Sequence, residues 1–178
     1  RSCKFLECTS KTKQKRNNSR FFLNNDHHQK QKETIFYLIR HAEKDRSNPE
    51  NKDPSLTNKG IIRANNWASY FDTITLNSIY TTDYLRTKQT VFPVSKLKKI
   101  TPKIYSPDEL DINKFININQ GKRVLISGHS DTTPSIVNKL IGENKFSNMS
   151  DSDNNSLYIV NILKSEVSVE VRSVTIGN

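Results

Sequence analysis

Unbroken apolar runs alternate with helix-like patterns along most of the chain. Residues 35–39 are β-branched, aromatic or aliphatic throughout, which is typical of a strand covered on both faces in a parallel sheet. Residues 167–172 instead alternate strictly between apolar and polar side chains, which predicts a half-exposed strand. The full set of predicted strands comprises residues 35–39, 78–81, 99–105, 122–127, 156–163 and 167–172.

Four helices are predicted between these strands. Thr57 is a plausible cap for the first helix, whose residues Ile61, Ala64, Ala68 and Phe71 recur at helical spacing. The second begins within residues 82–90 and is kinked or ended by Pro93, the third spans residues 107–118 with Leu110, Phe115 and Ile118 inward, and the fourth begins at Thr133 and Pro134 and stops at Gly142.

Strands that alternate with helices predict an α/β domain of three layers, with a central sheet that is mostly parallel. The short connection between residues 156–163 and 167–172, the three residues Lys-Ser-Glu, predicts an antiparallel hairpin at one edge. We expect residues 34–178 to form this single domain.

The basic charge of the chain is concentrated in its first 33 residues. The whole chain carries a formal net charge of +10, and residues 1–33 hold nine Lys or Arg against three Asp or Glu. This leader shows no apolar period and is predicted to be flexible. It is either a solvated arm without function, left after processing or cloning, or an anchor to anionic lipid or nucleic acid. Because the leader has few aromatic residues, no nucleic-acid partner is expected.

Both cysteines, Cys3 and Cys8, lie in this leader, so the predicted domain contains none. They form either a small disulfide loop or, as expected more often in a flexible arm, two free thiols. No apolar stretch is long enough to span a membrane. The sequence does not decide between a cytoplasmic location and, if a leader was removed, export to a periplasm. The Asn- and Lys-rich composition hints at a bacterial source.

Charged and imidazole side chains follow three of the predicted parallel strands. Arg40 and His41 come directly after residues 35–39, Arg86 follows residues 78–81, and His129 follows residues 122–127. The carboxyl ends of parallel strands meet at one edge of a sheet, where α/β folds bind ligands. Two guanidinium groups and two imidazoles at one edge predict an anion site, because Arg forks match phosphate oxygens. A neutral imidazole there can attack phosphorus.

Four tracts in this order resemble the histidine phosphatase superfamily, also called phosphoglycerate mutase-like. They are Leu38-Ile-Arg40-His41-Ala-Glu43, Leu56-Thr-Asn-Lys-Gly60, the segment from Tyr80 to Thr90 that contains Arg86, and Ser127-Gly-His129-Ser, and they cover about residues 34–142. The resemblance implies a phosphoglycerate mutase-like fold, no cofactor and no metal. It also implies that His41 is the phosphorylated nucleophile, that Arg40 and Arg86 bind the phosphoryl group, and that His129 completes the pocket.

Two features depart from the family pattern. Ala42 stands where the family has Gly after the nucleophile, as in the Arg-His-Ala-Glu variant of small bacterial members. No motif fixes the general acid. By resemblance to the mutase-like branch it is Glu109, whereas Asp131 lies one residue beyond the position used by the acid phosphatase branch. We favour Glu109, and we expect Glu43 to orient Arg40 or His41.

The chain lacks the long insertions of mutases and phytases, so it resembles the compact branch that includes phosphohistidine phosphatases. This resemblance implies an open site for a phosphorylated small molecule or a phosphoprotein. The sequence does not decide the oligomeric state, although a monomer is favoured.

Two other functions compete with a phosphatase that forms phosphohistidine. The first is a non-catalytic phosphate-binding module. The second is a metal-dependent hydrolase with His41, Glu43, His129 and Asp131 as ligands, since imidazole and carboxylate are common ligands in hydrolases. Two arginines beside the cation would repel it, which disfavours the metal site.

Overall fold

The computed structural model describes residues 32–175 of the 178-residue chain. The predictions made for the basic leader, including its flexibility and the state of Cys3 and Cys8, lie outside the described residues apart from positions 32 and 33. Within the described part, no helix is both long and apolar enough to cross a membrane.

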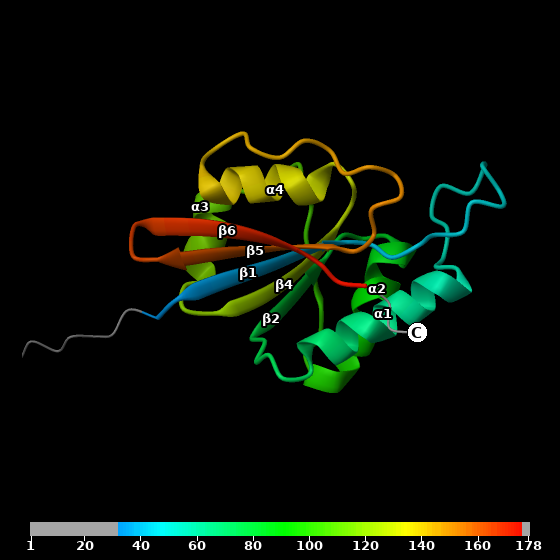
Figure 1. The fold of residues 1–178 in the computed structure, drawn as a ribbon, viewed down its shortest axis with the longest axis horizontal. Helices are drawn as coiled ribbons and strands as arrows, with labels where there is room; N and C mark the ends of the chain where they lie inside the picture. The colour runs from blue at the N-terminus through cyan, green and yellow to red at the C-terminus, as the bar shows by residue number, and fades with distance from the viewer. Residues whose placement is uncertain (1–31, 176–178) are drawn as a thin grey trace, which may run out of the picture.

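Six strands and four helices make up the described fold (Figure 1). In chain order they are β1 (Thr34–Arg40), α1 (Asn58–Phe71), β2 (Ser78–Thr81), α2 (Leu85–Lys98), β3 (Lys103–Ile104), α3 (Ile112–Ile118), β4 (Arg123–Gly128), α4 (Thr132–Ile141), β5 (Ser156–Leu163) and β6 (Glu166–Ser173).

The strands form one sheet in the order β3-β2-β4-β1-β5-β6. The pairs β1–β4, β2–β4 and β2–β3 are parallel, whereas β5 is antiparallel to both β1 and β6. The register pairs Arg40 with Gly128 and Thr81 with Ser127, so β1, β2 and β4 end at the same level of the sheet. This confirms the predicted α/β fold, and it brings the residues that follow these strands to one edge.

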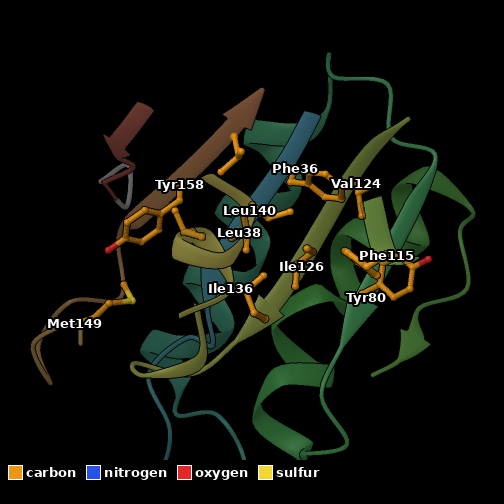
Figure 2. Packing of buried hydrophobic residues seen from close by; sticks show 12 residues of the cluster. Phe36, Leu38, Tyr80, Phe115, Val124, Ile126, Ile136, Leu140, Met149 and Tyr158 are labelled. Carbon is orange, nitrogen blue, oxygen red and sulfur yellow. The ribbon is translucent and has the colours of Figure 1, made fainter. Parts of the chain in front are cut away.

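The sheet lies between two helical layers, with α3 and α4 on one face and α1 and α2 on the other (Figure 1). On the first face, Phe36 and Leu38 of β1 and Ile126 of β4 pack with Ile136 and Leu140 of α4 (Figure 2). On the opposite face, a second cluster includes Ile39 and Leu125 from the sheet together with Trp67 of α1 and Val91 of α2. Burial on both faces explains the unbroken apolar run of β1.

Helix ends differ from the predicted bounds where local capping competes with the apolar period. α3 begins at Ile112 rather than at residue 107, because the Asp111 carboxylate accepts a hydrogen bond from Lys114 N at 3.1 Å and caps the helix there. Ile118, predicted to point inward, is 52% exposed. α4 is capped by Asp131 and already includes Thr132, so Thr133 is not its cap.

Two strand and turn predictions also need correction. The strand predicted at residues 99–105 shrinks to Lys103–Ile104, because Lys99 adopts a left-handed conformation at the end of α2 and Pro102 precedes the pairing. The β5–β6 hairpin is antiparallel as predicted, but its turn contains two residues, Lys164 and Ser165, since Glu166 already pairs with Leu163.

Pro93 does not end helix α2, which continues to Lys98. A proline removes one backbone N–H donor from a helix. Here Val91 and Val94 are fully buried against the sheet, so packing holds the turns on both sides of Pro93 in place.

Candidate active site

The four residues predicted at the strand ends lie together in the structure. Arg40, His41, Arg86 and His129 line one cleft of about 970 Å³ at the carboxyl edge of the sheet. The ring centroids of His41 and His129 are 5.5 Å apart, and Arg86 Nη2 lies 3.5 Å from His129 Nδ1. The parallel register of β1, β2 and β4 therefore assembles a pocket from segments that are more than 40 residues apart in sequence.

His41 is buried, with 4% of its surface exposed, and its ring orientation is fixed. Its Nδ1 lies 2.7 Å from the Ala42 carbonyl oxygen. A carbonyl oxygen only accepts, so Nδ1 carries the hydrogen and Nε2 of the neutral ring keeps a free lone pair. The main chain is held as well, since His41 N donates to Gly128 O and Asn154 Nδ2 donates to His41 O, both at 2.9 Å.

His129 takes the opposite tautomer. Arg86 lies at 3.5 Å from Nδ1 and can only donate, which makes Nδ1 an acceptor. His129 Nε2 then donates to Thr82 Oγ1 at 2.9 Å, and Thr82 Oγ1 lies 2.9 Å from Thr87 Oγ1. These two threonines were not singled out in the sequence, although both fall in the tract that contains Arg86.

Both imidazoles are neutral at pH 7. Burial is the main cause that lowers the pKa of His41 to about 3, and the charges of Arg40 and Arg86 add to it, while the hydrogen bond to Ala42 opposes it. Burial, followed by the charge of Arg86, lowers the pKa of His129 to about 4. A neutral His41 is the form that can act as a nucleophile.

These pKa values predict the acid limb of the pH–rate profile. A lowered pKa favours the neutral ring, so His41 remains a neutral nucleophile down to about pH 4. The neutral form is lost as the pH falls through about 3. We expect kcat/KM, corrected for the ionisation of the substrate phosphate, to show no loss from the enzyme between pH 7 and pH 5. Steady-state kinetics over pH 3.5–8 test this, and an acid limb near 6.5 would contradict it.

Arg40 is held by a loop that follows α4. Its Nη1 donates to the main-chain oxygens of Ser150, Asp151 and Asp153 at 2.8, 3.1 and 3.1 Å, and its Nη2 donates to Asp151 Oδ1 at 3.1 Å. The side chain is only 3% exposed, and its buried Nε has no partner among residues 32–175. An unpaired buried donor on a cation is costly, so this atom is suited to an anionic ligand.

Arg86 presents a similar unsatisfied donor. Its side chain is 11% exposed and its guanidinium carbon lies 4.3 Å from the centroid of the Tyr84 ring. The carboxylate of Asp53 lies 3.5 Å from Arg86 Nη1, while the buried Nε is without a partner in the described part of the chain. Both arginines therefore line the same cleft, and each has a buried Nε without a partner among the described residues.

Glu43 pairs with a residue that sequence reasoning missed. Arg63 Nε and Nη2 donate to the two carboxylate oxygens of Glu43 at 2.8 and 2.7 Å. Burial alone would raise the pKa of Glu43, but hydrogen bonds and charge from Arg63 outweigh it and lower this pKa. The signal was available, because Arg63 falls on the buried stripe of α1, whereas Ile61, predicted to be inward, is 49% exposed.

Gly60 allows the start of α1 to lie close to the main chain of Glu43. A Cβ atom at Gly60 would lie 2.3 Å from the main-chain oxygen of Glu43. The same oxygen accepts hydrogen bonds from Thr57 N at 2.9 Å and Thr57 Oγ1 at 3.2 Å. The tract from Leu56 to Gly60 thus positions the segment after His41, and Thr57 caps α1 as predicted by accepting from Gly60 N at 3.1 Å.

Both candidates for the general acid line the cleft and are exposed. Glu109 lies in the loop between β3 and α3, next to Asp108. Asp131 lies at the start of α4, where its Oδ1 accepts from Thr132 N at 2.8 Å. Asp131 therefore caps α4, whereas Glu109 has no such contact with its neighbours in residues 32–175.

The alternative metal ligands do not form a cluster. Within the described residues, no group of three or more His, Cys, Asp or Glu is arranged to hold a metal ion. Glu43 is occupied by Arg63, and Nδ1 of His41 faces the Ala42 carbonyl oxygen. The donor set therefore does not fit a metal held by His41, Glu43, His129 and Asp131.

Comparison with known families agrees with this geometry. Residues 36–110, which include Arg40, His41, Arg86 and Glu109, match the family described as the histidine phosphatase superfamily (branch 1). Over these residues the chain is similar to the histidine phosphatase superfamily (branch 1). The resemblance read from the four sequence tracts is thereby confirmed. A search of the curated proteins found no match.

Solved structures share the fold of this chain. A mycobacterial glucosyl-3-phosphoglycerate phosphatase aligns with a TM-score of 0.66 at 10% identity, over 81% of this chain and 100% of the other. An Agrobacterium tumefaciens protein described as a SixA phosphohistidine phosphatase gives 0.58 at 16% identity, over 79% and 98%. A phosphoglycerate mutase from Bacillus anthracis gives 0.59 at 14% identity, over 79% and 92%. These similarities concern the fold, which is phosphoglycerate mutase-like.

Proposed function

We propose that residues 34–178 form a metal-independent phosphatase domain that hydrolyses a phosphate monoester or a phosphohistidine through a phosphohistidine intermediate on His41. One observation carries the proposal. The hydrogen bond from Nδ1 to the Ala42 carbonyl leaves Nε2 of a buried, neutral His41 unprotonated, in a cleft that is also lined by Arg40 and Arg86.

The first half of the reaction transfers the phosphoryl group to the protein. The lone pair of His41 Nε2 attacks phosphorus, the Nε2–P bond forms, and the bond from phosphorus to the leaving oxygen or nitrogen breaks. Arg40 and Arg86 donate to the equatorial oxygens, where negative charge is concentrated. His129 already donates its Nε2 proton to Thr82 Oγ1 and its Nδ1 faces Arg86, so it supports the phosphoryl group only after a change of protonation or of partner.

The leaving group needs a proton, which we assign to Glu109. Both Glu109 and Asp131 line the cleft, but the Asp131 carboxylate already accepts a hydrogen bond as the cap of α4. In the second half, the deprotonated carboxylate takes a proton from water, which attacks phospho-His41 and releases inorganic phosphate and the free imidazole. Glu43 has a positioning role, because its bidentate pair with Arg63 fixes the segment after His41.

The substrate is a phosphorylated small molecule or a phosphoprotein. Support comes from the fold neighbours, whose names include a sugar-phosphate phosphatase, a phosphohistidine phosphatase and a phosphoglycerate mutase. The open cleft of about 970 Å³ has room for a small ester or for a side chain presented by a protein.

The phosphoenzyme is the species that tests this proposal. Acid-free rapid quench of the protein with a ³²P-labelled aryl phosphate is expected to trap label that survives alkali and is lost in acid, as a phosphoramidate bond is. Peptide mapping is expected to place the label on the peptide that contains His41. Turnover with no trapped label under single-turnover conditions, or label on another residue, would contradict the proposed intermediate.

A non-catalytic phosphate-binding module is the second candidate. The unpaired buried Nε atoms of Arg40 and Arg86 favour anion binding whether or not chemistry follows. Saturable binding of inorganic phosphate without turnover of any monoester or phosphoamide would favour this function.

A further inference from the structure

The candidate active-site cleft has a cationic floor and an anionic rim. Its lining contains three cations, Arg40, Lys44 and Arg86, and five carboxylates, Asp83, Asp108, Glu109, Asp131 and Asp151. The two arginines are deep, whereas the five carboxylates are all exposed. With both imidazoles neutral, the acids outnumber the cations in a cleft built on a basic protein of net charge +10.

Only two of these carboxylates are compensated by ion pairs. Asp83 lies 2.8 Å from Lys88 Nζ, and Asp151 lies 2.6 Å from Arg46 and 3.1 Å from Arg40. In residues 32–175, the three remaining carboxylates, Asp108, Glu109 and Asp131, have no ion pair. One general acid accounts for one of the three, so at least two carry negative charge that the proposed chemistry does not use.

The deep part of the cleft nevertheless favours the binding of an anion. Arg40 is 3% exposed, lines the cleft and keeps an Nε without a partner among the described residues. If the proposed function holds, this anion is the phosphoryl group of the substrate. The part of the substrate beyond the phosphoryl group then faces the rim carboxylates.

We propose, resting on that function, that the preferred substrates are zwitterionic: a phosphoryl group on a leaving part that carries a positive charge. Phosphate esters of amino or quaternary ammonium alcohols and phosphorylated residues in basic peptide segments have this chemistry. A second anionic group on the leaving part is disfavoured, because it lies beside Asp108, Glu109 and Asp131. Unit charges a few ångströms apart interact by about 1 kcal/mol in water, and salt screens this interaction.

A pair of isosteric probes isolates the charge. Phosphocholine and 3,3-dimethylbutyl phosphate differ by nitrogen against carbon at one centre, so their shapes match. We expect kcat/KM for phosphocholine to exceed that for the carbon analogue by about fivefold at low ionic strength, and the ratio to fall below about twofold in 0.5 M NaCl. A ratio of one at low salt, or a ratio that does not respond to salt, overturns the proposal.

The variant Asp108→Asn tests whether the rim is the source of the preference. Asp108 has no role in the proposed chemistry, and its loss is expected to lower the ratio of the two kcat/KM values by about twofold. Glu143→Gln is the matched control, since Glu143 is exposed just beyond the far end of α4 and does not line this cleft. An equal effect of both variants overturns the assignment to the rim.

Direct binding separates this inference from the proposed function. Titration calorimetry with both probes measures affinity without turnover. A binding preference for phosphocholine without hydrolysis of either probe supports the zwitterionic site and contradicts the phosphatase function. Hydrolysis and binding that do not distinguish the probes support the phosphatase and contradict the zwitterionic site.

Discussion

Replacing His41 by alanine is expected to lower kcat/KM for an aryl phosphate by about 10³-fold or more, because no other group can take over as the nucleophile. Among the described residues, His129 is the only other imidazole that lines the cleft, and its free lone pair on Nδ1 is directed to Arg86. The measurement is steady-state release of inorganic phosphate by the wild-type protein and the variant.

Two controls keep this result interpretable. His41→Asn retains a side-chain N–H, yet it has no lone pair of imidazole basicity, so it is expected to be as inactive as the alanine variant. The contact from Asn154 is to the main-chain oxygen of His41, so it survives both substitutions. Thermal unfolding and binding of inorganic phosphate are expected to remain close to those of the wild type. Turnover within tenfold of the wild type in either variant would contradict a nucleophilic His41.

The sequence predicted the convergence at the cleft because one rule of parallel sheets governs it. Residues that follow parallel strands meet at one edge. Arg40, His41 and His129 lie at or directly after the end of a strand, and Arg86 lies in the first turn of the helix that follows β2. The prediction required only that β1, β2 and β4 be neighbours in the sheet. The observed pairing of β4 with both β1 and β2 meets this requirement.

The contacts that hold these groups could not be predicted in the same way. Arg40 is anchored by main-chain oxygens of residues 150–153, more than 100 positions away in a polar loop that has no periodic pattern. Main-chain oxygens carry no signature in the sequence. Thr82, whose hydroxyl accepts from His129 Nε2, was equally hidden, since a threonine after a strand has many other roles.

Arg63 shows a signal that was present but misassigned. The helical period of α1 was recognised and Ala64 was placed correctly, but Ile61 was assigned to the buried stripe and Arg63 was left out of it. A cation on the buried face of a helix requires a carboxylate partner. Glu43, the last residue of the nucleophile tract, meets this requirement, so its carboxylate pairs with Arg63 and not with Arg40 or His41.

Replacing Arg86 by alanine is expected to lower kcat/KM by about 10²-fold to 10³-fold, the usual cost of removing one donor that stabilises charge in a transition state. Arg86 has few competing partners, since Asp53 lies at 3.5 Å and the Nε is unpaired in the described part of the chain. Its donors are therefore available to the phosphoryl oxygens. Kinetics with an aryl phosphate and the affinity for inorganic phosphate are the measurements.

Two further variants separate the shape of the guanidinium from its charge. Arg86→Lys keeps the charge but loses the planar fork, so we expect it to recover only part of the lost rate. Lys96→Ala removes the same charge from an exposed position on the same helix, α2, and is expected to stay within twofold of the wild type, because long-range interactions between exposed charges are screened. If Lys96→Ala and Arg86→Ala have equal effects, the loss reflects the overall charge of the domain and not phosphoryl binding by Arg86. If Arg86→Lys matches the wild type, a point charge is sufficient, and a bidentate contact of Arg86 with the phosphoryl group is not required.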